Sequence, residues 1–174
     1  MNLLRVCTVL AVFAPASALA EDHSGKFSGK FTHQEMMPLD QQGQKMVVGL
    51  TSTGSNKNTD KTDFMNDAQV VWGGTTVIEQ GKGPEQGIIT LVAKDGTASA
   101  VFTGTATMQM QQDGPRINGQ GTWEVVSGTG AYENYKGKGN YTRTATSKTD
   151  FEGEWKGSLT KGMRDPETTA SPRR

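Results

Sequence analysis

The sequence predicts an all-β fold, a single antiparallel up-and-down barrel of about eight strands, with a β-sandwich as the alternative. Apolar and polar residues alternate along many segments, as they do in strands that have one buried face. Helical spacing of apolar residues is almost absent from the chain. Turn-forming residues separate these segments, and strands that pair in sequence order favour closure into a barrel without exposed edges.

Residues 1–20 have the pattern of a Sec-type signal peptide. A short cationic start through Arg5 leads into an apolar stretch, and an A-x-A cleavage site ends at Ala20. The apolar stretch is too short to span a bilayer as a helix. We therefore expect an exported protein, periplasmic or extracellular, whose mature chain, residues 21–174, has no integral membrane segment.

The composition restricts the chemistry of the mature chain. Cys7 is the sole cysteine of the sequence and lies in the predicted signal peptide, so we expect no disulfide, no thiol nucleophile and no thiolate metal site. The 18 Lys and Arg residues balance the 18 Asp and Glu residues. This balance argues against a nucleic-acid partner, which would need an excess of basic residues to neutralise phosphates.

We expect the first strand in residues 24–35, where Phe27, Phe31 and His33 share one face, and a second strand around residues 46–50. The further predicted strands are residues 68–78, 87–93, 98–112, 119–127, 137–147 and 151–161. Glycines recur inside these strands, at Gly104, Gly121, Gly139, Gly153 and Gly157. This pattern fits a barrel, because bent strands and closely approaching backbones need residues without a Cβ atom.

Two segments are predicted to lie outside the core of the single barrel domain, residues 21–161. Residues 52–66 form a long polar connection and are the best candidate for a lid or a mobile loop. Residues 162–174 contain two prolines and are predicted to be a disordered tail.

The candidate metal ligands have weak patterns. His33 and Glu35 share a strand face and could bind a metal together with His23 or Asp22, but a surface histidine beside a glutamate is the commoner arrangement. Four oxygen-bearing side chains follow the spacing of a calcium loop, although a lysine stands where that loop needs glycine. These four are Asn56, Asn58, Asp60 and Asp67. We expect no metal and no cofactor, and we assign no catalytic residue.

The candidate ligand-binding residues are aromatic and methionine side chains on the predicted strands. They are Trp72, Phe102, Met108, Met110, Trp123, Tyr141 and Trp155. The same side chains would line the core of any filled barrel. A small barrel can instead enclose one apolar molecule, and flexible methionines suit an adaptable lining.

The second half of the chain carries recurring glycine and aromatic motifs. They are G-T-W at residues 121–123, S-G-T-G-A-Y at 127–132, G-K-G-N-Y at 137–141 and E-W-K-G at 154–157, with Q-G-K-G-P-E-Q-G-I at 80–88 upstream. With these motifs the chain resembles exported bacterial proteins that have an allene-oxide-cyclase-like or dirigent-like β-barrel. Gly121-x-Trp123 is also similar to the lipocalin G-x-W motif, which belongs on the first strand of that family.

The resemblance implies an eight-stranded antiparallel barrel and little about activity. Plant cyclases of this barrel type isomerise an unsaturated fatty-acid epoxide with a buried carboxylate and an ordered water. No residue of this sequence can be matched to that carboxylate, and Glu124 would point inward only if Trp123 pointed outward.

We therefore expect an exported, non-enzymatic barrel that binds a small apolar or amphipathic molecule in its interior. One alternative is a cyclase or isomerase of the allene oxide cyclase type that acts on a lipid-like substrate. A second alternative is a dirigent-like structural or assembly protein, for which a homo-oligomer is possible.

Overall fold

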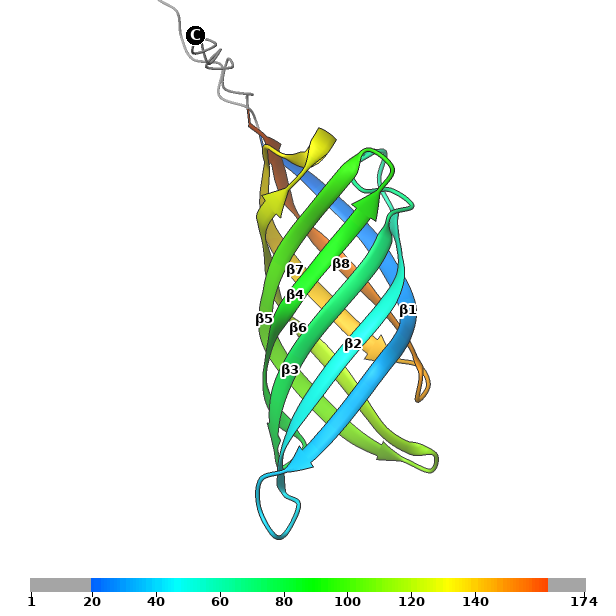
Figure 1. Cartoon of the computed structure of the whole chain (residues 1–174), viewed down its shortest axis with the longest axis vertical. Coiled ribbons are helices and arrows are strands. Elements are labelled where there is room, and N and C mark those ends of the chain that lie inside the picture. Colours follow the sequence, from blue (N-terminus) through cyan, green and yellow to red (C-terminus); the bar gives the residue numbers. More distant parts are fainter. Residues whose placement is uncertain (1–19, 163–174) are drawn as a thin grey trace, which may run out of the picture.

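The computed structural model describes residues 20–162, which form one sheet of eight antiparallel strands. The strands are β1 (Glu21–Pro38), β2 (Lys45–Asn58), β3 (Gln69–Glu79), β4 (Lys82–Ala93), β5 (Gly96–Gln111), β6 (Gly114–Gly128), β7 (Tyr135–Ala145) and β8 (Asp150–Lys161). Consecutive strands pair with each other, and β1 pairs with β8, so the sheet closes into a barrel (Figure 1). The predicted all-β fold with eight antiparallel strands in one closed sheet is confirmed. Most of the predicted signal peptide and tail, residues 1–19 and 163–174, lies outside the described residues.

The two ends of the barrel differ. One end, here called the capped end, carries the β2–β3 loop (residues 59–68), the β4–β5 turn and a short 3-10 helix, η1 (Gly130–Tyr132) (Figure 1). The other end carries the turns of the four remaining hairpins. β6 pairs with β7 only from Gly119 to Glu124, so these strands separate toward the capped end, where Tyr132 of η1 is buried.

The half of the barrel away from the capped end is filled by apolar side chains. Val48, Ile78, Ala106 and Ile117 point inward there, and each is at most 3% exposed. They come from β2, β3, β5 and β6 and belong to one continuous core cluster. This half of the barrel therefore has a packed core, which is the main source of stability for a domain without disulfides.

The outward position of His33 corrects the predicted face of β1. Phe31 pairs with Ser52 and His33 pairs with Thr51, so Thr32 is an extra residue that forms a β-bulge. The bulge reverses the phase of the strand, and the His33 side chain is 64% exposed. The prediction that Phe27, Phe31 and His33 share one face is therefore wrong for His33.

The polar connection at residues 52–66 belongs to the barrel, and its predicted place outside the core is wrong. β2 continues to Asn58, and the inward side chains of Ser52 and Asn56 are each 1% exposed. Phe64 and Met65 in the following loop are buried as well, at 7% and 0% exposed. Polar residues at inward positions hid the strand, because the period-2 pattern of apolar residues stops at Leu50.

Several glycines inside strands make room for aromatic rings in the barrel interior. The Trp123 indole lies over Gly139 and Gly157, where an added Cβ atom would stand 2.7 Å and 2.5 Å from Cζ2 of that indole. The Phe27 ring lies over Gly153 in the same way. The glycines predicted to suit a barrel therefore also permit large rings inside a narrow one.

We expect Gly157→Ala to lower the free energy of unfolding by about 1–3 kcal/mol, because the new methyl group would collide with the backbone carbonyl oxygen of Lys138 and with the Trp123 indole. Gly49→Ala is the matched control, since an added Cβ atom there meets no atom within 4 Å. Urea unfolding of both variants checks the prediction. Equal stability of the two variants would contradict it.

Candidate functional site

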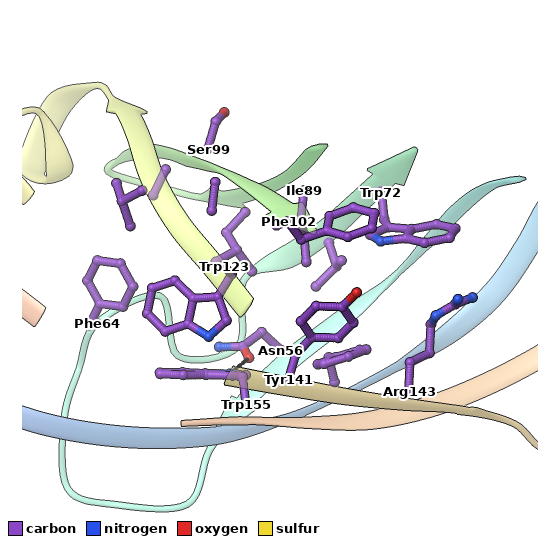
Figure 2. A pocket seen from close by; sticks show the side chains of 16 residues that line it. Asn56, Phe64, Trp72, Ile89, Ser99, Phe102, Trp123, Tyr141, Arg143 and Trp155 are labelled. Atoms are coloured by element: carbon purple, nitrogen blue, oxygen red, sulfur yellow. Dashed lines mark hydrogen bonds between the residues drawn. The ribbon is translucent and has the colours of Figure 1, made fainter. Parts of the chain in front are cut away.

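The barrel encloses a cavity of about 80 Å³ in the half next to the capped end. All eight strands and the β2–β3 loop contribute side chains to its walls. Figure 2 labels the lining residues Asn56, Phe64, Trp72, Ile89, Ser99, Phe102, Trp123, Tyr141, Arg143 and Trp155. Small side chains of β5, at Ala98 and Ala100, leave the space that these larger side chains surround.

Seven of the sixteen residues that line the cavity are aromatic, and five of them form two groups. Trp123 and Trp155 meet edge to face, with ring centroids 5.8 Å apart. Trp72 stacks on Phe102 at 5.5 Å, and Phe102 meets Tyr141 edge to face at 5.6 Å. These are the geometries that aromatic pairs prefer, so the wall is a preformed apolar surface.

The β2–β3 loop closes the cavity at the capped end. Its Phe64 ring lines the cavity and meets Tyr132 edge to face, with centroids 5.6 Å apart. Two asparagine side chains of β2 hold the loop: Asn58 Nδ2 donates to the carbonyl oxygen of Phe64 at 2.8 Å, and Asn56 Nδ2 donates to that of Met65 at 2.9 Å. The loop is therefore a cap fixed by hydrogen bonds, and Phe64 is the side chain of the loop that lines the cavity.

A buried polar group lies beside the apolar wall. Glu85 of β4 accepts a hydrogen bond from Tyr141 Oη at 2.6 Å and an ion-paired hydrogen bond from Arg143 Nη2 at 2.8 Å. Glu85 is 5% exposed and Arg143 is 2% exposed. Gly119 of β6 faces the carboxylate, and a Cβ atom at Gly119 would collide with Glu85 Oε1. The missing side chain at Gly119 thus leaves room in the barrel interior for one buried carboxylate and its two hydrogen-bond donors.

The guanidinium of Arg143 lies between aromatic rings. Its Cζ atom is 4.6 Å from the ring centroid of Trp72 and 6.0 Å from that of Phe31, within the range of cation–π attraction. Burial lowers the pKa of Arg143, and the charge of Glu85 opposes this shift. An arginine stays protonated in proteins, so Arg143 and Glu85 form a buried pair of opposite charges.

Burial, the hydrogen bond to Glu85 and the charge of Glu85 raise the pKa of Tyr141 above its ordinary value. A raised pKa favours the folded state below pH 10, and this contribution is lost as the pH rises past the value of about 10 that tyrosine has in the unfolded chain. We expect the stability difference between the wild type and Tyr141→Phe to narrow progressively as the pH rises above about 10. Urea unfolding at several pH values measures it, and a constant difference would contradict the prediction.

Five of the seven sequence-predicted ligand-binding residues line the cavity: Trp72, Phe102, Trp123, Tyr141 and Trp155. Met108 and Met110 do not. Met108 packs against the core cluster in the filled half of the barrel, and Met110 is 72% exposed. β4 pairs with β5 only as far as Thr107, so the β5–β6 hairpin extends beyond its neighbours and carries Met110 out of the barrel.

Sequence reasoning missed Glu85 and Arg143. The strand predicted at residues 87–93 begins at Lys82 in the structure, and Glu85 has the same inward phase as Ile89. Arg143 follows Tyr141 by two residues and shares its inward phase. The alternation of inward and outward residues along each strand could have indicated both positions. Charged residues are rare at inward positions, however, so the sequence prediction did not include Glu85 or Arg143.

The candidate metal ligands have other contacts. His33 Nε2 lies 3.8 Å from a Glu35 oxygen, with both side chains largely exposed, and His23 Nδ1 lies 3.3 Å from an Asp60 oxygen. Asn56 and Asn58 hold the cap. Within residues 20–162, no group of three or more His, Cys, Asp and Glu side chains has the arrangement of a metal site.

No protein-family model matches the chain, and no curated protein or solved structure is significantly similar to it. The resemblance to allene-oxide-cyclase-like and dirigent-like barrels therefore stays a prediction from sequence motifs. In the described part of the chain, no helix has the length and apolar character to cross a membrane. Fold and site together define a small closed β-barrel with an aromatic interior cavity and a buried Glu–Arg–Tyr group.

Proposed function

We propose that this protein is an exported binding protein that holds one small, mainly apolar molecule inside the barrel. The observation that carries the proposal is the cavity, which has walls of Trp, Phe and aliphatic side chains and one polar group at its edge. Ligand sites commonly have this composition, an apolar surface with a few placed polar groups. Export is part of the proposal, since β1 begins at Glu21, directly after the predicted cleavage site.

The size of the cavity restricts the ligand. At about 80 Å³ the cavity is smaller than the roughly 300–1,000 Å³ pockets of drug-sized ligands. The ligand is therefore compact, of the size of a single ring or a short branched chain. Entry is expected at the capped end, beside Phe64, because core side chains fill the other half of the barrel.

Filling the cavity tests the proposal. We expect Ala100→Leu to weaken binding of small apolar molecules at least tenfold, because the longer side chain occupies the space that Ala100 leaves. Val101→Leu is the matched control, since Val101 is the next residue of β5 and points outward, 40% exposed. Displacement of a fluorescent apolar dye measures binding. Equal affinities of both variants and the wild type would contradict interior binding.

An isomerase of the allene oxide cyclase type is the alternative. Such an isomerase requires a carboxylate that points into the barrel, and Glu85 meets this requirement. Glu124 does not meet it, because Glu124 is exposed while its neighbour Trp123 lines the cavity. Both oxygens of Glu85 already accept hydrogen bonds from Tyr141 and Arg143, which leaves this carboxylate poorly placed to act as a base. Binding without turnover is therefore the better supported function.

Self-association of a dirigent-like kind remains the second alternative. The outer face of β3, β4 and β5 supports it, because exposed apolar residues gather there: Val71, Ile88, Val92 and Val101, 38–48% exposed. Light scattering at high protein concentration distinguishes a monomer from a self-associated form. A strict monomer would exclude this alternative and leave the binding proposal intact.

A further inference from the structure

We propose that the ligand of this cavity carries no hydrogen-bonding group, so that the barrel selects a compact hydrocarbon over polar molecules of the same shape. The inference rests on the proposed function and specifies its ligand class. It makes the cavity a site for a hydrocarbon with a single ring or a short branched chain.

The accessible wall of the cavity is almost entirely carbon. Besides its seven aromatic residues, the lining has six aliphatic ones: Val70, Ile89, Leu91, Ala98, Ala100 and Val125. The other three lining residues are Asn56, Ser99 and Arg143. Whether a polar ligand could bind therefore depends on what these three side chains, the tyrosine hydroxyl and the indole N–H groups already contact.

The Asn56 side chain is buried, 1% exposed, and its amide bonds within the protein. Its Oδ1 atom accepts a hydrogen bond from Trp155 Nε1 at 2.7 Å, which Figure 2 shows as a dashed line. Its Nδ2 atom donates to the carbonyl oxygen of Met65 at 2.9 Å and to Asn58 Oδ1 at 3.1 Å. Both N–H groups of the amide thus have partners, and the Trp155 indole has one as well.

Two further polar groups bond away from the cavity. Ser99 Oγ lies at hydrogen-bond distance from Thr90 Oγ1, 2.9 Å, and Figure 2 shows the Ser99 side chain pointing away from the rings. Trp123 Nε1 donates to the backbone carbonyl oxygen of Asn140 at 3.1 Å. The remaining indole N–H, that of Trp72, is a single donor in a wall that otherwise presents carbon.

The buried Glu–Arg–Tyr group does not provide a partner for the ligand. Tyr141 Oη and Arg143 Nη2 both donate to the Glu85 carboxylate. Among the described residues, Arg143 Nε and Nη1 have no hydrogen-bond partner, but neither nitrogen has accessible surface. A molecule in the cavity therefore cannot contact them.

This wall makes the binding of a polar ligand unfavourable. A hydroxyl or carbonyl group would lose its hydrogen bonds to water on entry, and the loss is largest in surroundings that offer no partner in return. A hydrocarbon loses no hydrogen bonds, leaves water and gains dispersion contacts with closely packed rings. The cavity thus selects its ligand by the absence of hydrogen-bond partners.

Toluene and phenol test the inference, because they have nearly the same shape and differ by a methyl group in place of a hydroxyl. The measured quantity is the ratio of their dissociation constants, phenol over toluene, from displacement of an apolar dye at neutral pH, where phenol is uncharged. We expect a ratio of about a hundredfold or more, whereas a wall that supplies a hydrogen bond would give about tenfold or less.

Two variants place a hydroxyl in the wall. Val70→Thr changes a lining residue that is 1% exposed with little change of shape, and we expect the ratio to fall at least about fivefold. Ala100→Ser is a second such variant, should the first fail to fold. Val71→Thr is the matched control: Val71 is the next residue of β3 and is 45% exposed, so the ratio should not change.

The outcomes separate this inference from the proposed function. A high ratio in the wild type that falls in Val70→Thr or Ala100→Ser supports the hydrocarbon site. A low ratio in the wild type, with both probes bound, overturns this inference alone, and its rise in Trp72→Phe would identify the Trp72 N–H as the partner of phenol. A ratio unchanged in both polar variants also overturns it. Failure of every probe to bind overturns the proposed function and this inference with it.

Discussion

Arg143→Met should lower the free energy of unfolding by about 3–5 kcal/mol, one of the two largest effects of a single substitution that we expect in this barrel. The substitution removes the ion pair to Glu85 and leaves a carboxylate, 5% exposed, without its cation. An unpaired buried charge is far less favourable than a buried apolar side chain of similar size. Urea unfolding with tryptophan fluorescence measures the loss.

The double variant Glu85→Gln/Arg143→Met is the control for this prediction. It removes both charges, so we expect it to be clearly more stable than Arg143→Met alone. A single variant as stable as the wild type would show that Glu85 and Arg143 do not form a buried ion pair. If the double variant is no more stable than Arg143→Met, the loss of stability comes from packing around Arg143.

Phe64→Ala should also cost about 3–5 kcal/mol, because it removes a buried ring from the cap. Phe64 is 7% exposed and contacts Tyr132 and Tyr135, with ring centroids 5.6 Å and 4.9 Å away. The same change opens the cavity at the capped end. We therefore expect small apolar molecules to bind and leave faster in this variant than in the wild type.

Stopped-flow fluorescence with an apolar dye measures both rates, and thermal unfolding measures stability. Met110→Ala is the matched control, since Met110 is 72% exposed at the other end of the barrel and should change neither property. Unchanged exchange rates in Phe64→Ala would mean that ligands do not enter through the cap, and the proposed route would be wrong.

The sequence predicted most of the fold because strand alternation and turn residues are local signals. Trp72, Phe102 and Trp155 occupy the inward phase of their strands, as a period of two predicts. His33 was misplaced because a bulge at Thr32 shifts the phase, and no residue type there marks the bulge. One inserted residue is enough to turn the rest of a strand over.

The polar part of the candidate site was not predictable in the same way. Ser52 and Asn56 look like loop residues in the sequence, yet they point into the barrel. The partners Glu85 and Arg143 stand far apart in the chain and meet only because β4 and β7 face each other across a closed sheet. The cavity likewise depends on which inward side chains are small, a property of three-dimensional packing rather than of any single strand.

The most direct test of a ligand-binding barrel is native mass spectrometry of residues 21–174, purified with and without prior extraction by organic solvent. The account predicts a reproducible adduct of low mass that is lost on extraction and is absent from Ala100→Leu, in which the cavity is filled. A bare mass in every preparation, together with no uptake from a panel of small apolar molecules, would contradict the account.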